Sequence, residues 1–243
     1  MNMVGLVTGA NRGLGYELTK LGLEEGHIMI ATYRSELLEG ADLLRLKEGY
    51  GEQLVLEKMD VINDAEVARA AANIAEQHPV IDFIINNAGV LYESRFTEKD
   101  AILDLDIDML RSTLDINAVG PAIVLKYFMP MVYQSKEGCI INITSEGAHL
   151  SPGGYQYLAY SMSKHALNMY TQQIRNYLVE KQSEKAIRIY MIHPGRLDTI
   201  MGKENAQMSP VESAVGIFNI LHSDAYNDLE IPFINYKGEL MPY

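Results

Sequence analysis

The chain has little cysteine, little positive charge and no long hydrophobic run. Its one cysteine, Cys139, cannot form an internal disulfide, and its place in the apolar run CIINIT predicts a small buried core residue. The 20 lysines and arginines against 32 aspartates and glutamates give a net charge of −12, which argues against non-specific binding to nucleic acid or anionic membranes. No apolar run reaches the ~18 residues of a membrane span, and no signal peptide precedes the first strand. We therefore expect a soluble, cytoplasmic protein.

Short β-branched runs alternate with helix-like segments along the 243 residues, of which 48% are hydrophobic. That alternation is typical of βαβ units and a parallel sheet. We predict an α/β fold, a single doubly wound, Rossmann-like domain over residues 1–243 with a mostly parallel sheet flanked by helices. The expected strands are 3–9, 27–33, 54–61, 79–89, 138–145, 186–195 and a short candidate at 232–236. The expected helices are 14–26, 35–50, 64–77, 106–131, 160–180 and 210–223.

A glycine-rich loop, TGANRGLG, joins the first strand to the first helix and contains Gly9, Gly13 and Gly15. Glycines let the chain turn sharply and let the backbone approach a ligand closely. The helix that follows points its free N–H groups and its positive dipole end at an anion. We expect a nucleotide phosphate to bind here. A glycine-rich turn without a ligand is the alternative.

The end of the second strand bears on the choice between NAD and NADP. Tyr33 stands where an acid would hydrogen-bond a ribose, and Arg34 follows it. Arg12, in the glycine loop, can converge on the same point, and guanidinium groups suit a phosphate. This pattern favours NADP(H) over NAD(H). The alternatives are a solvated Arg34 and some influence of the nearby acid Glu36.

A tyrosine and a lysine four residues apart lie on the same face of a helix, where the ammonium group can lower the pKa of the phenol. Such a tyrosine can pass a proton at neutral pH, which suits carbonyl reduction or alcohol oxidation. An isolated pair of this kind is more often a surface pair. Of the three copies, only Tyr160/Lys164 follows a strand that ends in a hydroxyl, Ser145; the other two are Tyr16/Lys20 and Tyr177/Lys181.

Several motifs appear in the order of the short-chain dehydrogenase/reductase family, which the chain resembles along nearly its whole length. They are TGANRGLG, Asp60-Val61, Asn86-Asn87-Ala88-Gly89, Asn117, Ser145, Tyr160-x-x-x-Lys164 and Pro194-Gly195. The second strand, INAVGP, HPGRLDT and the short tail are most similar to the branch that contains C-factor, sniffer and related carbonyl reductases. The resemblance implies NADP(H) as cofactor, held by Gly9, Asn11, Arg12, Gly13, Leu14, Gly15, Arg34, Asp60, Val61, Asn87, Ala88, Gly89, Tyr160, Lys164, Pro194, Gly195 and Thr199.

The resemblance also implies catalytic roles. Tyr160 would be the general acid in reduction and the base in the reverse reaction, and Lys164 would lower its pKa and hold the nicotinamide ribose. Ser145 would hydrogen-bond the substrate oxygen. Asn117 would hold a water that links Lys164 to solvent, unless it is bonded only to the backbone. Asp60 would accept from the adenine amino group, unless it only caps the turn that follows.

Other side chains near these motifs leave choices open. We expect Arg196 to pair with Asp198, although it could instead attract an acidic substrate. His149 and His193 lack the spacing of metal ligands, so we expect structural roles and no metal. Tyr155 and Tyr157 line the substrate pocket or simply pack, and residues 200–210 are a candidate lid.

The predicted function is NADP(H)-dependent hydride transfer between nicotinamide and a small-molecule carbonyl or alcohol. The resemblance implies a homodimer or homotetramer, with a two-fold interface along the helices that carry Asn117 and Tyr160. A second hypothesis, from another class, is a regulatory protein that binds NADPH with little turnover. A third is an α/β domain that binds no cofactor.

Overall fold

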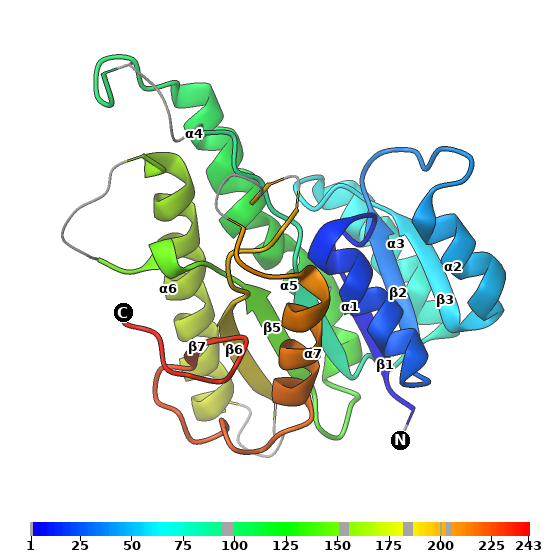
Figure 1. Ribbon diagram of the computed structural model, residues 1–243. Coiled ribbons are helices and arrows are strands. Elements are labelled where there is room, and N and C mark those ends of the chain that lie inside the picture. The colour runs from blue at the N-terminus through cyan, green and yellow to red at the C-terminus, as the bar shows by residue number, and fades with distance from the viewer. Residues whose placement is uncertain (1, 94–99, 151–155, 182–186, 200, 203–205) are drawn as a thin grey trace.

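A computed structural model of the chain describes residues 2–93, 100–150, 156–181, 187–199, 201–202 and 206–243. Within these residues, seven strands form one sheet in the order β3-β2-β1-β4-β5-β6-β7 (Figure 1). All neighbouring pairs are parallel, which confirms the predicted doubly wound α/β fold. The strands are β1 (Val4–Val7), β2 (Ile28–Tyr33), β3 (Leu54–Lys58), β4 (Phe83–Asn86), β5 (Cys139–Ile143), β6 (Arg188–His193) and β7 (Phe233–Asn235).

Helices cover both faces of the sheet (Figure 1). One face packs against α1, α2 and α7, and the other packs against α3, α5 and α6. In the described part of the chain no helix is long and apolar enough to cross a membrane. The helices are α1 (Gly13–Glu24), α2 (Asp42–Tyr50), α3 (Asp64–Gln77), α4 (Ile107–Leu114), α5 (Gly120–Val132), α6 (Leu158–Lys181) and α7 (Pro210–Leu221).

The core divides into two layers because successive side chains of a strand point to opposite faces. In β5, Ile141 packs with α1 and α7, whereas its neighbour Ile140 packs with α3 and α5. Cys139 is buried in the first layer, as predicted, and burial raises the pKa of its thiol to about 12. The thiol therefore stays protonated and acts as a small apolar residue.

Two expected helices differ from the observed ones. The helix predicted over 35–50 begins only at Asp42, because Gly40 has a φ of +76°, a left-handed conformation that a helix cannot contain. The helix predicted over 106–131 is interrupted by one π-helical turn at Asp115–Val119. Pro121 has no N–H, so it cannot donate to the carbonyl of Asn117 four residues earlier. This missing donor explains why the regular ladder is broken there.

The sheet order reverses direction between β1 and β4, which are neighbours in space. Because all the strands are parallel, the loops that follow β1, β2, β4, β5 and β6 meet at one edge of the sheet. Ligands of doubly wound sheets bind in the crevice at this edge. Thr8, at the end of β1, ties the two central strands together here, since its Oγ1 accepts the backbone N–H groups of Asn87 and Ala88, both at 3.0 Å.

Candidate active site

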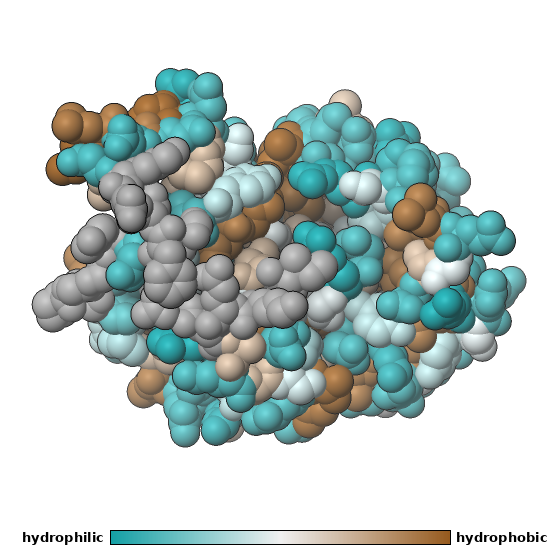
Figure 2. All heavy atoms as spheres, turned by 45° about the horizontal axis from the view of Figure 1, so that its top comes forward, coloured by the Kyte–Doolittle hydropathy of each residue, from teal (hydrophilic) through white to brown (hydrophobic). Residues whose placement is uncertain are grey.

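A cavity of about 700 Å³ opens at the carboxyl edge of the sheet. Figure 2 shows that this face is hollowed, with hydrophobic side chains inside the hollow and hydrophilic ones around it. The cavity brings together predicted residues from six separate parts of the chain. Those that line it are Gly9, Asn11, Arg12, Gly13, Leu14, Arg34, Asp60, Val61, Asn87, Ala88, Gly89, Tyr160, Lys164, Pro194 and Thr199.

The glycine loop has the conformation that an anion site requires. Gly9 and Gly13 have φ values of +66° and +55°, which other residues rarely adopt. A Cβ on Gly15 would lie 2.4 Å from the carbonyl oxygen of Gly9, so only glycine lets α1 approach the loop this closely. Among the described residues, no side chain caps α1 and its first turn holds no acid. The positive end of the helix therefore faces the cavity.

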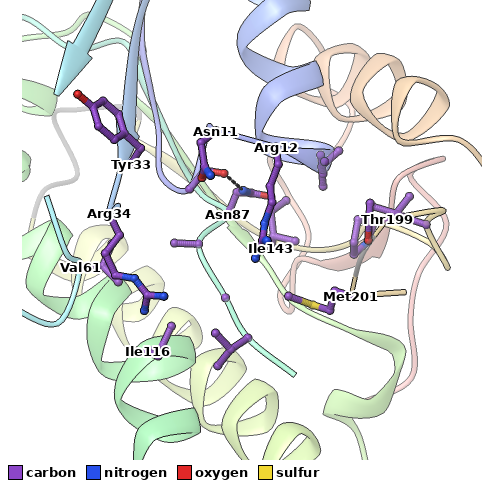
Figure 3. Close-up of a pocket in the computed structure, with 18 of the residues that line it drawn as sticks. Asn11, Arg12, Tyr33, Arg34, Val61, Asn87, Ile116, Ile143, Thr199 and Met201 are labelled. Carbon is purple, nitrogen blue, oxygen red and sulfur yellow. Dashed lines mark hydrogen bonds between the residues drawn. The ribbon is translucent and has the colours of Figure 1, made fainter. Parts of the chain in front are cut away.

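Two arginines reach into the cavity from different elements, Arg12 from the start of α1 and Arg34 from the end of β2 (Figure 3). The ring of Tyr33 points away from them (Figure 3). Glu36, the acid that could have opposed an arginine, forms an ion pair with Lys58 instead. Its charge is thereby directed away from the arginines. Of the described residues at the end of β2, those that line the cavity are Tyr33, Arg34 and Ser35, and none of the three is an acid.

The Ser145, Tyr160 and Lys164 side chains converge at the ends of β5 and α6. Ser145 hydrogen-bonds the phenol of Tyr160 and also accepts the N–H of Gly147 at 3.2 Å. The Nζ atom of Lys164 lies 5.8 Å from the centroid of the Tyr160 ring and donates to the carbonyl of Ile143 at 2.8 Å. The three groups expected from the sequence are thus brought together, with the phenol next to the serine.

The pKa of Tyr160 moves opposite to the predicted direction. Burial raises it above the usual 10.0, the hydrogen bond from Ser145 lowers it, and the charge of Glu146 raises it. Burial also lowers the pKa of Lys164 to about 8, and this side chain is only 4% exposed. Desolvation disfavours the charged form of both groups. The sequence shows the spacing of phenol and ammonium but not the burial that raises the pKa of Tyr160, and Lys164 is not among the groups that shift this pKa.

Asn117 lies inside the π turn and is fully buried. Its side chain accepts the N–H of Val90 at 2.8 Å and donates to the carbonyl of Val90 and to the hydroxyl of Ser163, both at 2.9 Å. The amide group is therefore engaged by the main chain and by one hydroxyl, which differs from the alternative of an asparagine bonded only to the backbone. The main-chain carbonyl of Asn117 cannot accept an α-helical hydrogen bond from residue 121, which is proline and has no N–H.

Asp60 lines the cavity and also caps the turn that follows β3. Its Oδ1 accepts the N–H of Ile62 at 3.3 Å, and its own N–H donates to Glu66 at 2.9 Å. Asp60 therefore caps the turn, and it also lies where it could accept a hydrogen bond from an adenine amino group. Val61 is buried beside it.

Four predicted residues do not line the cavity: Gly15, Asn117, Ser145 and Gly195. Gly195 has a φ of +87° and would clash with Met208 if it carried a Cβ, so it shapes the turn after β6. The sequence analysis did not predict ten of the residues that line the cavity. Most of them are next to a motif in the sequence, and this adjacency could have identified them. They are Tyr33, Ser35, Met59, Val90, Ile116, Ile143, Thr144, Leu197, Asp198 and Met201.

Arg196 pairs with Glu146 and not with Asp198. The Nε atom of Arg196 lies 2.5 Å from Oε1 of Glu146, whereas Asp198 lines the cavity. The prediction was wrong because β5 and β6 are neighbours in the sheet, which places the residues that follow each of them side by side. Residues 200 and 203–205 of the candidate lid, and residues 151–155 with Tyr155, lie outside the described residues.

Of the two histidines discussed above, His193 forms a hydrogen bond, whereas Nδ1 of His149 is buried and has no hydrogen-bond partner among the described residues. His193 accepts the N–H of Glu146 at 3.1 Å, and burial lowers its pKa. In the described residues, one group has metal-ligand atoms within 4.8 Å of one another: Glu25, His27 and His222. Nδ1 of His27 accepts the N–H of Met3, whereas its Nε2, which lies 3.4 Å from Oε2 of Glu25, is buried and has no hydrogen-bond partner among the described residues. Nε2 of His222 lies 2.8 Å from the same oxygen of Glu25. This group lies at the opposite edge of the sheet, beside the start of β2.

Comparison with known proteins gives the chain relatives along most of its length. It matches the family described as short chain dehydrogenase over residues 3–210. The mouse (Mus musculus) protein named dehydrogenase/reductase SDR family member 7B is 33% identical over 201 residues, which are 82% of this chain and 58% of that protein. The NADPH-dependent pterin aldehyde reductase of Arabidopsis thaliana is 26% identical over 231 residues, 93% of this chain and 92% of that protein.

A solved structure supports the same family. The crystal structure of NADPH-bound carbonyl reductase from chicken fatty liver has a TM-score of 0.84 and 26% identity, and covers 100% of this chain and 99% of that chain. The chain belongs to the short-chain dehydrogenase/reductase family, a family of oxidoreductases, as its motifs predicted. It spans little more than half the length of the mouse relative.

Proposed function

We propose that the protein is an NADP(H)-dependent oxidoreductase that reduces the carbonyl group of a small molecule. The observation that carries this proposal is the hydrogen-bonded Ser145 and Tyr160 pair beside Lys164, at the edge of a cavity with an open helix N-terminus. The proposal needs a bound nicotinamide, which supplies the hydride when present. The residues of this chain supply orientation, a proton and charge stabilisation.

The chemistry of the cavity suits NADP(H). The glycine loop and the start of α1 would hold the diphosphate, and Arg12 and Arg34 would hold the 2′-phosphate. Asp60 and Val61 would bound the adenine site, and Asn87, Ala88 and Gly89 would line the cofactor. The Arabidopsis relative and the chicken structure are both described with NADPH, which supports the same choice.

Tyr160 donates its phenolic proton to the carbonyl oxygen as that oxygen gains negative charge. Its raised pKa keeps the phenol protonated at neutral pH, which is the form that reduction needs. Ser145 hydrogen-bonds the same oxygen and stabilises its charge. Lys164 holds a ribose hydroxyl and, when charged, favours loss of the phenolic proton. The main-chain carbonyl of Asn117 would bind a water that returns a proton to Lys164 from solvent.

We also propose a homodimer, or a tetramer built from it, along α5 and α6. Large apolar side chains remain exposed on α6 and at the end of the π turn that precedes α5, and such patches are typical of interaction surfaces. They are Val119, Met162, Met169, Tyr177 and Val179. The single sheet, which extends from β3 to β7, supports one domain over residues 1–243.

The test follows NADPH absorbance with a panel of carbonyl compounds that includes nitrobenzaldehyde, menadione and phenanthrenequinone, beside a fluorescence titration with NADPH. An enzyme should bind NADPH with a dissociation constant near or below ~1 μM, about −8 kcal/mol, and reduce members of the panel. Saturable binding with no turnover across the panel would favour the NADPH-binding regulator. Absence of binding would favour an α/β domain without a cofactor.

A further inference from the structure

A glutamate in the segment that follows β4 holds the start of the helix that carries Tyr160. Oε1 of Glu93 accepts the backbone N–H of Ala159, and Oε2 accepts the backbone N–H of Tyr160, both at 2.8 Å. These N–H groups belong to the first turn of α6, which begins at Leu158 and has no helical acceptors for them. Glu93 lies 66 residues earlier than Ala159 in the chain, so this is a tertiary contact and not a local helix cap.

The contact closes a ring of hydrogen bonds around Tyr160. The carbonyl of Tyr160 accepts the hydroxyl of Ser163 at 2.7 Å, and that hydroxyl accepts Nδ2 of Asn117 at 2.9 Å. Asn117 in turn binds both main-chain groups of Val90, three residues before Glu93. Both main-chain groups of Tyr160 are therefore fixed, one by Glu93 and the other through the π turn. Removing Glu93 opens the ring at the N–H of Tyr160.

We propose that Glu93 is a positioning residue for Tyr160 and that its carboxylate fills an anion site at the start of α6. The carboxylate complements the positive end of a helix of 24 residues. It also binds two N–H groups of the first turn at once, those of Ala159 and Tyr160. This inference rests on the proposed function of Tyr160 as proton donor. A group acting through Tyr160 alters the rate of proton transfer more than the binding of NADPH.

The experiment compares Glu93→Ala and Glu93→Gln with the wild-type protein, using the panel compound that is reduced fastest. Loss of the carboxylate should lower kcat about 10- to 100-fold, because misplacement of a reacting group by ~1 Å has effects of that size. The dissociation constant of NADPH should change by less than about 3-fold. Sodium formate, a carboxylate small enough to occupy the vacated site, should restore part of kcat in Glu93→Ala, and sodium chloride at equal ionic strength should not.

Glu48→Ala is the matched control, because Glu48 is an exposed glutamate on α2. Its kcat should equal that of the wild type and should not respond to formate. If Glu93→Ala does not fold, as judged by circular dichroism, Glu93→Gln decides, since it retains the shape and can satisfy only one of the two N–H groups. A kcat near the wild-type value, or no difference between formate and chloride, overturns the role of Glu93. If Tyr160→Phe also retains turnover, the proposed function itself fails.

Discussion

Arg12 and Arg34 bring two guanidinium groups into one cavity, and Arg34 offers the cleaner test of cofactor choice. Arg34→Ala should weaken NADPH about 10- to 100-fold, since a charge-assisted hydrogen bond contributes ~1.5–3 kcal/mol, and should leave NADH almost unchanged. Titration of both nucleotides measures this. Arg45→Ala, an exposed arginine on α2, is the control. Equal weakening of the two nucleotides would place the 2′-phosphate elsewhere.

Lys164 should lower the free energy of unfolding of the protein, although turnover depends on it. Burial lowers its pKa from 10.5 to about 8, so below pH 8 the folded state carries a buried ammonium group that the unfolded chain solvates freely. Lys164→Met should therefore raise the free energy of unfolding by about 1–3 kcal/mol at pH 7 and abolish most turnover. The difference should shrink between pH 8 and 10.5, as both states lose the proton. Urea unfolding at pH 7 and pH 10 measures it, and a destabilised variant would contradict it.

For single residues, the sequence predicted which side chains belong to the site better than it predicted their burial and their partners. Strand ends, helix spacing and the family resemblance together predicted Arg34, Tyr160 and Lys164 as site residues, and all three line one cavity. The sequence could not predict that burial raises the pKa of Tyr160, because desolvation depends on the packing of distant segments. The partner of Arg196 was wrong for a related reason, since strand order determines which loop lies beside it.

Among the elements, the π turn at Asp115–Val119 is the one most closely tied to the site. Pro121→Ala supplies an N–H that can close the ladder onto Asn117, so the turn should revert towards an α-helix. We expect the free energy of unfolding to rise by about 1–3 kcal/mol, with kcat falling about 10-fold as Asn117 shifts. Thermal unfolding and steady-state kinetics measure the two effects.

Pro130→Ala is the matched control, because Pro130 lies inside α5 beyond the π turn. It should keep wild-type kcat. Unchanged kcat in Pro121→Ala as well would show that the π turn has no part in turnover.

Hydrophobic periodicity located the strands and most helices, and it failed where single residues control the backbone. A hydrophobic pattern with a period near 3.6 residues does not distinguish an α-helical turn from a single π-helical turn. The helix predicted over 106–131 therefore appeared continuous. Pro121 and Gly40 were the available signals for the interruption and for the late start of α2. The short run at 232–236 became β7 because β6 offered it a parallel edge.

For the whole molecule, binding of the cofactor should stabilise the fold, because the cavity joins loops from β1, β2, β4 and β6. NADPH at 100 times its dissociation constant should add about 2.7 kcal/mol, which is roughly a 5–10 °C rise in Tm for a chain of this length. NADH at the same concentration should give a smaller rise. Thermal unfolding with each nucleotide measures the difference, and equal shifts would contradict the preference for NADP(H).

The tertiary contacts that complete the site lay beyond sequence reasoning. Glu93 and Tyr160 are 67 residues apart, and Arg196 and Glu146 are 50 apart. No local pattern relates such pairs, because they meet only after the sheet order is fixed. The order of motifs along the chain predicted the fold and the cavity, whereas the geometry between motifs needed the structure.

The proposed role of Tyr160 is tested most directly by the single-turnover rate at which bound NADPH is oxidised by the best carbonyl substrate. Tyr160→Phe should lower that rate at least ~10²-fold and leave the dissociation constant of NADPH within a few fold. Tyr177→Phe, which has a lysine at the same spacing on the exposed part of α6, should react like the wild type. A Tyr160→Phe protein that oxidises NADPH at the wild-type rate would contradict the proposed mechanism.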